Sequence, residues 1–293
     1  MSDITASMVK ELRETTGAGM MECKKALVES NGDMQLAIDN MRKSGTAKAA
    51  KRAGRIAAEG AIVVAINNDK TSACMIEANC ETDFVARDVN FKSFSDSLSQ
   101  AGLAAKANEV ETLMAQKTSS GATFETAREA LVAKIGENIQ ARRVVTLTAA
   151  GCVGAYLHGE RIGVLVALDK NNLELAKDIA MHVAATNPLS VDASGLSQDV
   201  LAKEREIVTA QAQTSGKPAN IVEKMVEGRL QKFVQEVCLV HQPFVKNPDQ
   251  KIEDLLKQAG AKVLSFVRFE VGEGISKPVT DLAAEVNATL KTV

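Results

Sequence analysis

The sequence predicts an α+β protein in which an N-terminal bundle of three helices precedes a duplicated core of antiparallel hairpins and helices. Three observations lead to this prediction. Short amphipathic segments separated by glycines occupy residues 1–55, a strand–turn–strand–helix pattern occurs twice between residues 60 and 185, and a heptad-like apolar repeat runs through residues 197–237. At 293 residues, the chain exceeds one ordinary compact core, so several domains are expected.

The N-terminal bundle is predicted from three short helices, at residues 5–15, at residues 20–30 and from Asp33 to Ser44-Gly45. Each helix ends at a glycine-containing turn, where the chain leaves helical geometry. Helices of this length bury an apolar face only against one another. The following residues 46–58 are basic and rich in alanine, and a tethering helix and a solvated linker fit this segment equally well.

The first core unit is predicted as a hairpin followed by helices. Its strands lie at residues 60–66 and 73–78, and its helices at 90–107 and 126–139, with a polar break at 116–123. The second unit repeats the order with strands at 153–158 and 162–168 and a helix at 173–185. This repetition suggests an internal duplication.

The remaining elements belong to the second unit or project from it. The heptad-like segment predicts an antiparallel helical hairpin that is interrupted by Ser215-Gly216-Lys217-Pro218. After it we expect strands near 237–240 and 263–271, a helix near 252–258 and a last helix at 281–290.

Composition argues against several function classes. Hydrophobic residues make up 45% and charged residues 25%, which is ordinary for a soluble globular protein. No apolar run approaches the ~20 residues of a membrane helix, and no secretory signal is apparent, so a cytoplasmic location and no membrane partner are expected. The net charge of −2 and the aromatic content of 3% argue against a dedicated nucleic-acid binder.

No catalytic site, metal site or cofactor is predicted. The chain has no phosphate-binding loop motif, and its histidines (His158, His182 and His241) lack metal-ligand spacing. A Ser-His-Asp or Cys-His arrangement assembled in space stays open, because sequence spacing does not test it. His182 is interpreted as a satisfied core histidine, and His158, beside a turn, as exposed. The cysteines, which form no Cys-x-x-Cys pair, are expected to be reduced and buried: Cys23, Cys74, Cys80, Cys152 and Cys238.

The most unusual stretch runs from Asn79 to Arg87, between a strand and a helix. Thr82 or Asp83 can cap that helix, which places Phe84 in its first turn. Patterning alone favours Phe84 as part of the core, with an exposed anchor as the alternative.

Four segments together resemble the elongation factor Ts family, the exchange factors of the GTPase elongation factor Tu. Asn79-Cys80-Glu81-Thr82-Asp83-Phe84-Val85 is similar to the family's signature loop. The other three segments are Leu12 to Leu27, Lys134 to Asn138 with Arg142-Arg143, and Arg268 to Ile275. They keep the family order and span nearly the whole chain. The segment from Gln116 to Thr123 departs from the resemblance, because it is longer than in the family.

The resemblance implies a domain organisation. A UBA-like three-helix domain would occupy residues 1–55 and the first core subdomain 56–146. The second core subdomain would combine 147–190 with 237–275, around a coiled-coil hairpin at 191–236, and a C-terminal helical module would occupy 276–293.

The resemblance also implies a function in translation elongation. The factor would bind elongation factor Tu in its GDP form, disturb Mg²⁺ and phosphate coordination, and promote GDP release so that GTP can bind. Thr82, Asp83, Phe84 and Val85 would face the nucleotide domain of the GTPase, where Phe84 would act as a wedge. Further contact positions are Met20, Met21, Lys24, Ile135, Gly136 and His158.

By the same resemblance the factor would act by protein binding rather than as an enzyme, and would bind no nucleotide or nucleic acid itself. A heterotetramer with two copies of each factor stays open. The runner-up is an RNA- or ribosome-associated binding protein without exchange activity, which rests on Lys48, Lys51, Arg52 and Arg55. An enzyme and a scaffold that binds a GTPase without affecting its nucleotide are weaker alternatives.

Overall fold

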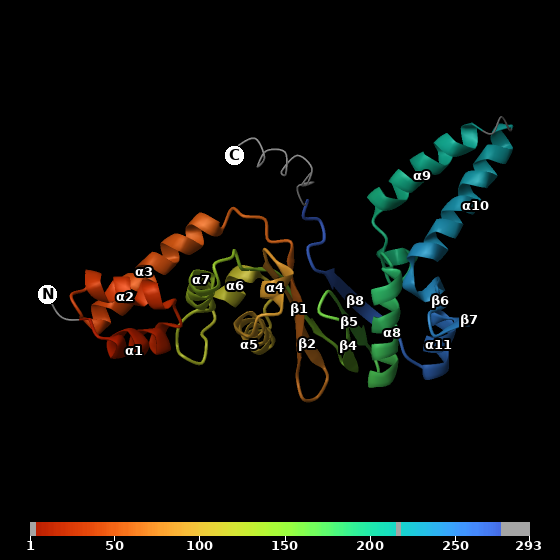
Figure 1. The fold of residues 1–293 in the computed structure, drawn as a ribbon. Helices are drawn as coiled ribbons and strands as arrows, with labels where there is room; N and C mark the ends of the chain where they lie inside the picture. Colours follow the sequence, from red (N-terminus) through yellow and green to blue (C-terminus); the bar gives the residue numbers. More distant parts are fainter. Residues whose placement is uncertain (1–3, 215–217, 277–293) are drawn as a thin grey trace.

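The computed structural model describes residues 4–214 and 218–276, and these residues form three parts in a row (Figure 1). A helical bundle lies at one end, two small sheets with covering helices lie in the middle, and a pair of long helices projects at the other end. The protein is therefore mixed α and β, as predicted.

The N-terminal bundle consists of α1 (Ala6–Thr16), α2 (Met20–Glu29) and α3 (Met34–Arg52). Thr5 and Asp33 cap α1 and α3 with their side chains, and α1 ends at Gly17, whose φ of 67° is left-handed. Fully buried Leu12, Leu27 and Ala37 form the centre of the bundle. The prediction of three N-terminal helices that pack together is confirmed.

The third helix does not end at Ser44-Gly45, so that prediction was wrong. It continues to Arg52, and Gly45 lies buried within it. A Cβ atom at Gly45 would lie 3.5 Å from the Ala133 Cβ of a later helix. Gly45 therefore lies where α3 packs against a later helix rather than at a helix end, and the basic segment is helical up to Arg52.

The first sheet has the antiparallel order β1-β2-β3, formed by β1 (Glu59–Ile66), β2 (Ser72–Cys80) and β3 (Gln140–Thr148). Helices on the side of the bundle cover it: α4 (Asp83–Ala86), α5 (Val89–Ala105), α6 (Val110–Met114) and α7 (Phe124–Ile135). Phe91 and Leu98 of α5 pack on Ile76 of β2 in the core beneath.

The second sheet has the antiparallel order β4-β5-β8, formed by β4 (Cys152–His158), β5 (Ile162–Leu168) and β8 (Val263–Glu270). Helix α8 (Leu173–Thr186) covers its outer face. The inner faces of the two sheets pack together through Ile62, Met75, Leu165 and Phe269. The repeated units thus form two sheets that share one core layer.

A buried carboxylate ties this central layer together. Glu77 of β2 is fully buried and accepts from Arg142 Nη1 at 3.1 Å and from Arg143 Nε at 2.5 Å. The Gly272 N–H, just after β8, donates to the same carboxylate at 2.8 Å. The Arg143 guanidinium also lies 4.3 Å from the centre of the Phe269 ring. One ion cluster therefore links β2, β3 and the end of β8.

The projecting pair consists of α9 (Gln198–Gln213) and α10 (Ala219–Val237), which pack through Val208, Ala212 and Val226. At its root, the Leu189 N–H donates to Val237 O at 2.8 Å, and Ser190 pairs with Cys238. The helical hairpin thus leaves and re-enters the core at nearly the same place. Short elements flank it, namely η1 (Ala193–Gly195), η2 (Leu239–His241), β6 (Pro243–Phe244), β7 (Asn247–Lys251) and α11 (Ile252–Ala259).

Three further details correct the predictions. Strand β3 was missed, and the helix predicted to reach Ile139 ends at Gly136, whose φ is 94°. Residues 237–240 form the end of α10 and part of η2 instead of a strand. The predicted helix at 281–290 lies outside the described residues. Among the helices that the structure describes, none combines the length and apolar character needed to cross a bilayer.

Candidate partner-binding surface

The loop after β2 presents Phe84 to solvent. Thr82 caps the one-turn helix α4, accepting the Val85 N–H at 3.4 Å, and Asp88 caps α5 immediately afterwards. The Phe84 side chain is 80% exposed, whereas Val85 is 8% exposed and belongs to the core. The expectation from patterning that Phe84 joins the core was wrong, because Val85 and Ala86 fill that position.

Exposed neighbours extend this loop on both sides of Phe84. Asp83 forms an ion pair with Arg87 at 3.0 Å, and Val89 at the start of α5 is 75% exposed. Sequence reasoning missed Val89. The sequence signal for its exposure was its position directly after the capping residue Asp88, because a side chain there points away from the buried face of the helix. Phe84 and Val89 are thus two exposed apolar side chains close together in the chain.

Ile135 and Gly136 lie beside this loop. Gly136 ends α7 in a left-handed conformation, and both residues are half-buried. The next residue, Glu137, accepts hydrogen bonds from the backbone of the Phe84 loop. The predicted positions Ile135 and Gly136 are therefore brought next to Thr82 to Val85.

Met20, Met21 and Lys24 stand on the first turns of α2 and are all exposed, with Met21 at 77%. The bundle connects to the loop region through Lys134. Its Nζ donates to Asn90 Oδ1 on α5 at 2.7 Å, and its Cε would lie 3.2 Å from a Cβ atom at Gly17, just before α2. Lys134 thus bridges the turn between α1 and α2 and the start of α5.

His158 ends β4 and is exposed, as predicted, with its Nδ1 3.3 Å from the Tyr156 hydroxyl. The turn that follows is joined to α5 by an ion pair between Glu160 and Lys92 at 2.7 Å. Lys92 lies one turn beyond Val89. The ion pair therefore connects the turn after His158 with the start of α5, next to the Phe84 loop.

Buried polar groups elsewhere serve the fold. His182 is fully buried, its Nε2 lies 2.9 Å from Gln242 Oε1, and its Nδ1 accepts the Val245 N–H at 3.3 Å. Burial lowers the pKa of His182, which keeps the ring neutral. This confirms the core-histidine prediction. All five cysteines are free and buried, also as predicted.

Within residues 4–214 and 218–276, no three His, Cys, Asp or Glu side chains come together as a metal site would require.

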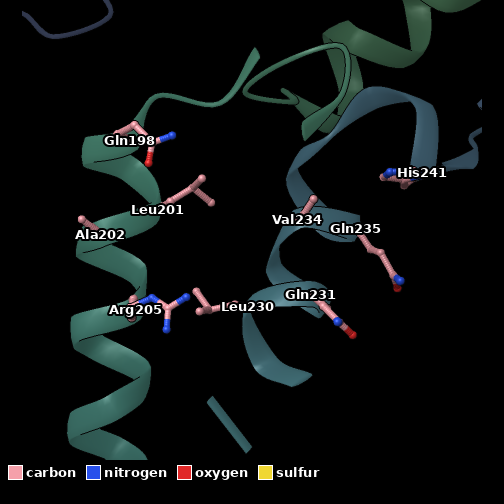
Figure 2. Close-up of a pocket in the computed structure, with 9 residues that line it drawn as sticks. All are labelled: Gln198, Leu201, Ala202, Arg205, Leu230, Gln231, Val234, Gln235 and His241. Carbon is pink, nitrogen blue, oxygen red and sulfur yellow. The ribbon is translucent and has the colours of Figure 1, made fainter. Parts of the chain in front are cut away.

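A shallow groove lies between α9 and α10 near the root of the hairpin (Figure 2). Leu201 and Arg205 of α9 point across it toward α10, where Leu230 lies opposite Arg205. The lining residues are Gln198, Leu201, Ala202, Arg205, Leu230, Gln231, Val234, Gln235 and His241. Glutamine side chains and small apolar groups dominate, and no charged groups converge as in a catalytic cleft.

Comparison with known proteins gives the same family as the sequence motifs. The sequence profile of the family described as "Elongation factor TS" matches residues 81–273. The chain is 58% identical to the "Elongation factor Ts" of Thioalkalivibrio sulfidiphilus, over 98% of this chain and 99% of the relative. It is 58% identical to that of Alcanivorax borkumensis, over 97% and 100%, and 53% identical to that of Legionella pneumophila, over 100% of both. The chain therefore belongs to the elongation factor Ts family.

Proposed function

We propose that this chain is a guanine-nucleotide exchange factor that binds elongation factor Tu in its GDP form and promotes GDP release, so that GTP can bind. The observation that carries the proposal is the exposed Phe84 on a capped one-turn helix whose other apolar residues are anchored in the core. Family membership supports the choice of partner.

The proposed mechanism uses Phe84 as an apolar wedge. Mg²⁺ demands near-octahedral oxygen coordination and neutralises phosphate charge, so a small shift of a helix that helps hold Mg²⁺ weakens both metal and nucleotide. Burying a phenylalanine side chain contributes about 1.5–3 kcal/mol. That gain arises only after the helix of the partner has moved. Factor and nucleotide then oppose each other's binding, which is a negative coupling between two sites.

The remaining predicted residues supply affinity around the wedge. Thr82, Asp83 and Val85 belong to the same loop, with Asp83 facing the partner and Val85 holding the loop on the core. Met20, Met21 and Lys24 on α2 form a second contact, and Ile135, Gly136 and His158 complete the surface. Lys134 bonds to Asn90 on α5, and Lys92 on the same helix pairs with Glu160 in the turn after His158, which supports placing these positions on one interface.

The proposal includes a domain organisation typical of this family. The bundle at residues 1–55 is UBA-like, and α9 and α10 pack as a coiled coil within residues 191–236. The C-terminal module expected at 276–293 lies, apart from residue 276, outside the described residues. The two core subdomains are residues 56–146 and residues 147–190 with 237–275.

No covalent bond changes in this mechanism, so the protein acts through binding in the cytoplasm and needs no cofactor. It binds neither nucleotide nor nucleic acid itself. A heterotetramer with two copies of each factor is a further possibility for the assembled complex.

The test is stopped-flow release of fluorescent GDP from elongation factor Tu, with excess unlabelled GDP, with and without this protein. A large acceleration that rises with factor concentration is expected. Binding without acceleration would favour a scaffold. Absence of binding, together with RNA affinity that falls steeply with salt, would favour the RNA-associated alternative.

A further inference from the structure

The loop that presents Phe84 is held by a carboxylate from another part of the chain. Glu137 is half-buried at the end of α7, and its Oε2 accepts the N–H groups of Glu81 at 3.1 Å and of Thr82 at 3.0 Å. Its Oε1 accepts the Thr82 hydroxyl proton at 2.7 Å. Both carboxylate oxygens thus bind the two residues that precede α4, through charge-assisted hydrogen bonds.

Thr82 passes this restraint on to α4. Because its hydroxyl donates to Glu137, its lone pairs remain free to accept the Val85 N–H. The Thr82 carbonyl accepts from the Cys80 thiol at 3.1 Å. Burial, reinforced by the negative charge of Glu137, raises the pKa of Cys80 to about 12, so the thiol keeps its proton as a donor.

The attachment is reciprocal and reaches the N-terminal bundle. Glu81 Oε1 accepts the Asn138 N–H at 2.6 Å. The Asn138 side-chain amide donates to Ala53 O at 3.3 Å and to Arg55 O at 2.7 Å, which are carbonyls of the chain leaving α3. Residues 137–138 therefore bond to the Phe84 loop on one side and to the bundle connection on the other.

We propose that Glu137 is a positioning residue, which fixes the Phe84 loop in its binding-competent geometry without itself touching the partner. This inference rests on the proposed exchange function. A four-residue helix is not stable alone, and an exposed Phe84 gives the loop no packing energy on its outer side. An ordered loop loses little conformational entropy on binding. Without Glu137 the loop is less ordered, so Phe84 should contribute less to binding and to GDP release.

Hydrogen exchange measures the restraint directly and needs no partner. In Glu137→Ala, the amides of Glu81 and Thr82 lose their acceptor, and we expect them to exchange at least about tenfold faster. Glu137→Gln keeps one amide oxygen that can accept both N–H groups, so its exchange rate is expected to be intermediate. Glu111→Ala, which removes the same charge from an exposed position on α6, serves as the matched control and should leave both amides unchanged.

The second measurement asks whether Glu137 acts through Phe84. Below saturation, Glu137→Ala is expected to reduce the acceleration of GDP release by about tenfold, matching the lost restraint. The double variant with Phe84→Ala is expected to be no slower than Phe84→Ala alone, because residues that act as one unit are not additive. Circular dichroism checks the fold, and Glu137→Gln replaces Glu137→Ala in both arms if the alanine variant does not fold.

Unchanged exchange of the Glu81 and Thr82 amides, or additive losses in the double variant, would overturn the positioning role. If the wild-type protein has no effect on GDP release, the proposed function is overturned, and so is the role of Phe84 in it. Normal wild-type release with additive losses would overturn the role of Glu137 alone.

Discussion

Replacing Phe84 by alanine is expected to weaken partner binding while leaving the fold intact. The side chain is 80% exposed in the free protein, and Val85 and Ala86 provide the buried contacts of the loop. The free energy of unfolding should therefore change by less than about 0.5 kcal/mol, as for other surface substitutions. If the ring becomes fully buried in the GTPase, its loss costs about 1.5–3 kcal/mol, which is about a 10- to 150-fold loss of affinity.

Two assays separate these effects. Thermal unfolding followed by circular dichroism reports the fold, and stopped-flow release of fluorescent GDP over a range of factor concentrations reports binding and acceleration. Leu264→Ala, which shortens a 53% exposed side chain on β8, is the matched control and should behave as wild type in both. A clear loss of thermal stability in Phe84→Ala would mean that the ring supports the fold. Unaltered GDP release would refute the wedge.

Three further predictions concern other parts of the molecule. Glu77→Ala should lower the free energy of unfolding by about 3 kcal/mol in urea titrations, because Arg142 and Arg143 lose their buried partner but keep some contact with water; an unchanged midpoint would contradict this. Burial holds the pKa of His182 below the usual value for histidine, so the unfolded chain binds the extra proton first. Stability should therefore fall as pH drops below about 6.5, by up to about 1.4 kcal/mol per pH unit. His182→Gln should flatten this dependence, and an equal slope in both proteins would exclude the assignment. Replacing residues 193–236 by a short Gly-Ser linker should leave the core folded and part of the exchange activity intact. The reason is that the two ends of the helical hairpin already pair at Leu189 and Val237. Complete loss of activity in a folded protein would refute this prediction.

Local signals predicted the helix boundaries only where the cause was local. Gly17 ends α1, as predicted, because it adopts a left-handed conformation that glycine tolerates well. Gly45 is also a glycine and yet lies buried within α3, where this helix packs against α7. Nothing near Gly45 in the sequence announces that neighbour.

Strand β3 was missed for a similar reason. Two adjacent arginines, Arg142 and Arg143, obscure the alternation of a half-buried strand. Their charges are met by Glu77 on the adjoining strand, a partner that becomes apparent only once the strands are paired.

In the candidate site, too, features with a local cause were predicted and features that depend on distant residues were not. The sequence narrowed the helix cap to Thr82 or Asp83, since capping depends on residues only a few positions apart, and Thr82 is the cap. Whether Phe84 or Val85 enters the core depends on the direction in which α4 leaves β2, and patterning chose wrongly. The bonds of Glu137 to Glu81 and Thr82 join segments far apart in sequence, so no local motif could reveal them.

The order of strands in the second sheet has a consequence for how the chain folds during synthesis. Strand β5 ends at Leu168, but its neighbour β8 begins only at Val263, after the whole helical hairpin has been made. Pairing across such a long loop adds closure entropy and slows folding. The first sheet is complete by Thr148, so it can form on the ribosome while β5 still has an open edge. Translation of residues 263–272 then completes the sheet, supplies Phe269 to the shared core and brings the Gly272 N–H to Glu77. A nascent chain halted before residue 263 would therefore expose an unpaired strand and an incompletely covered apolar layer, which are the features that favour aggregation.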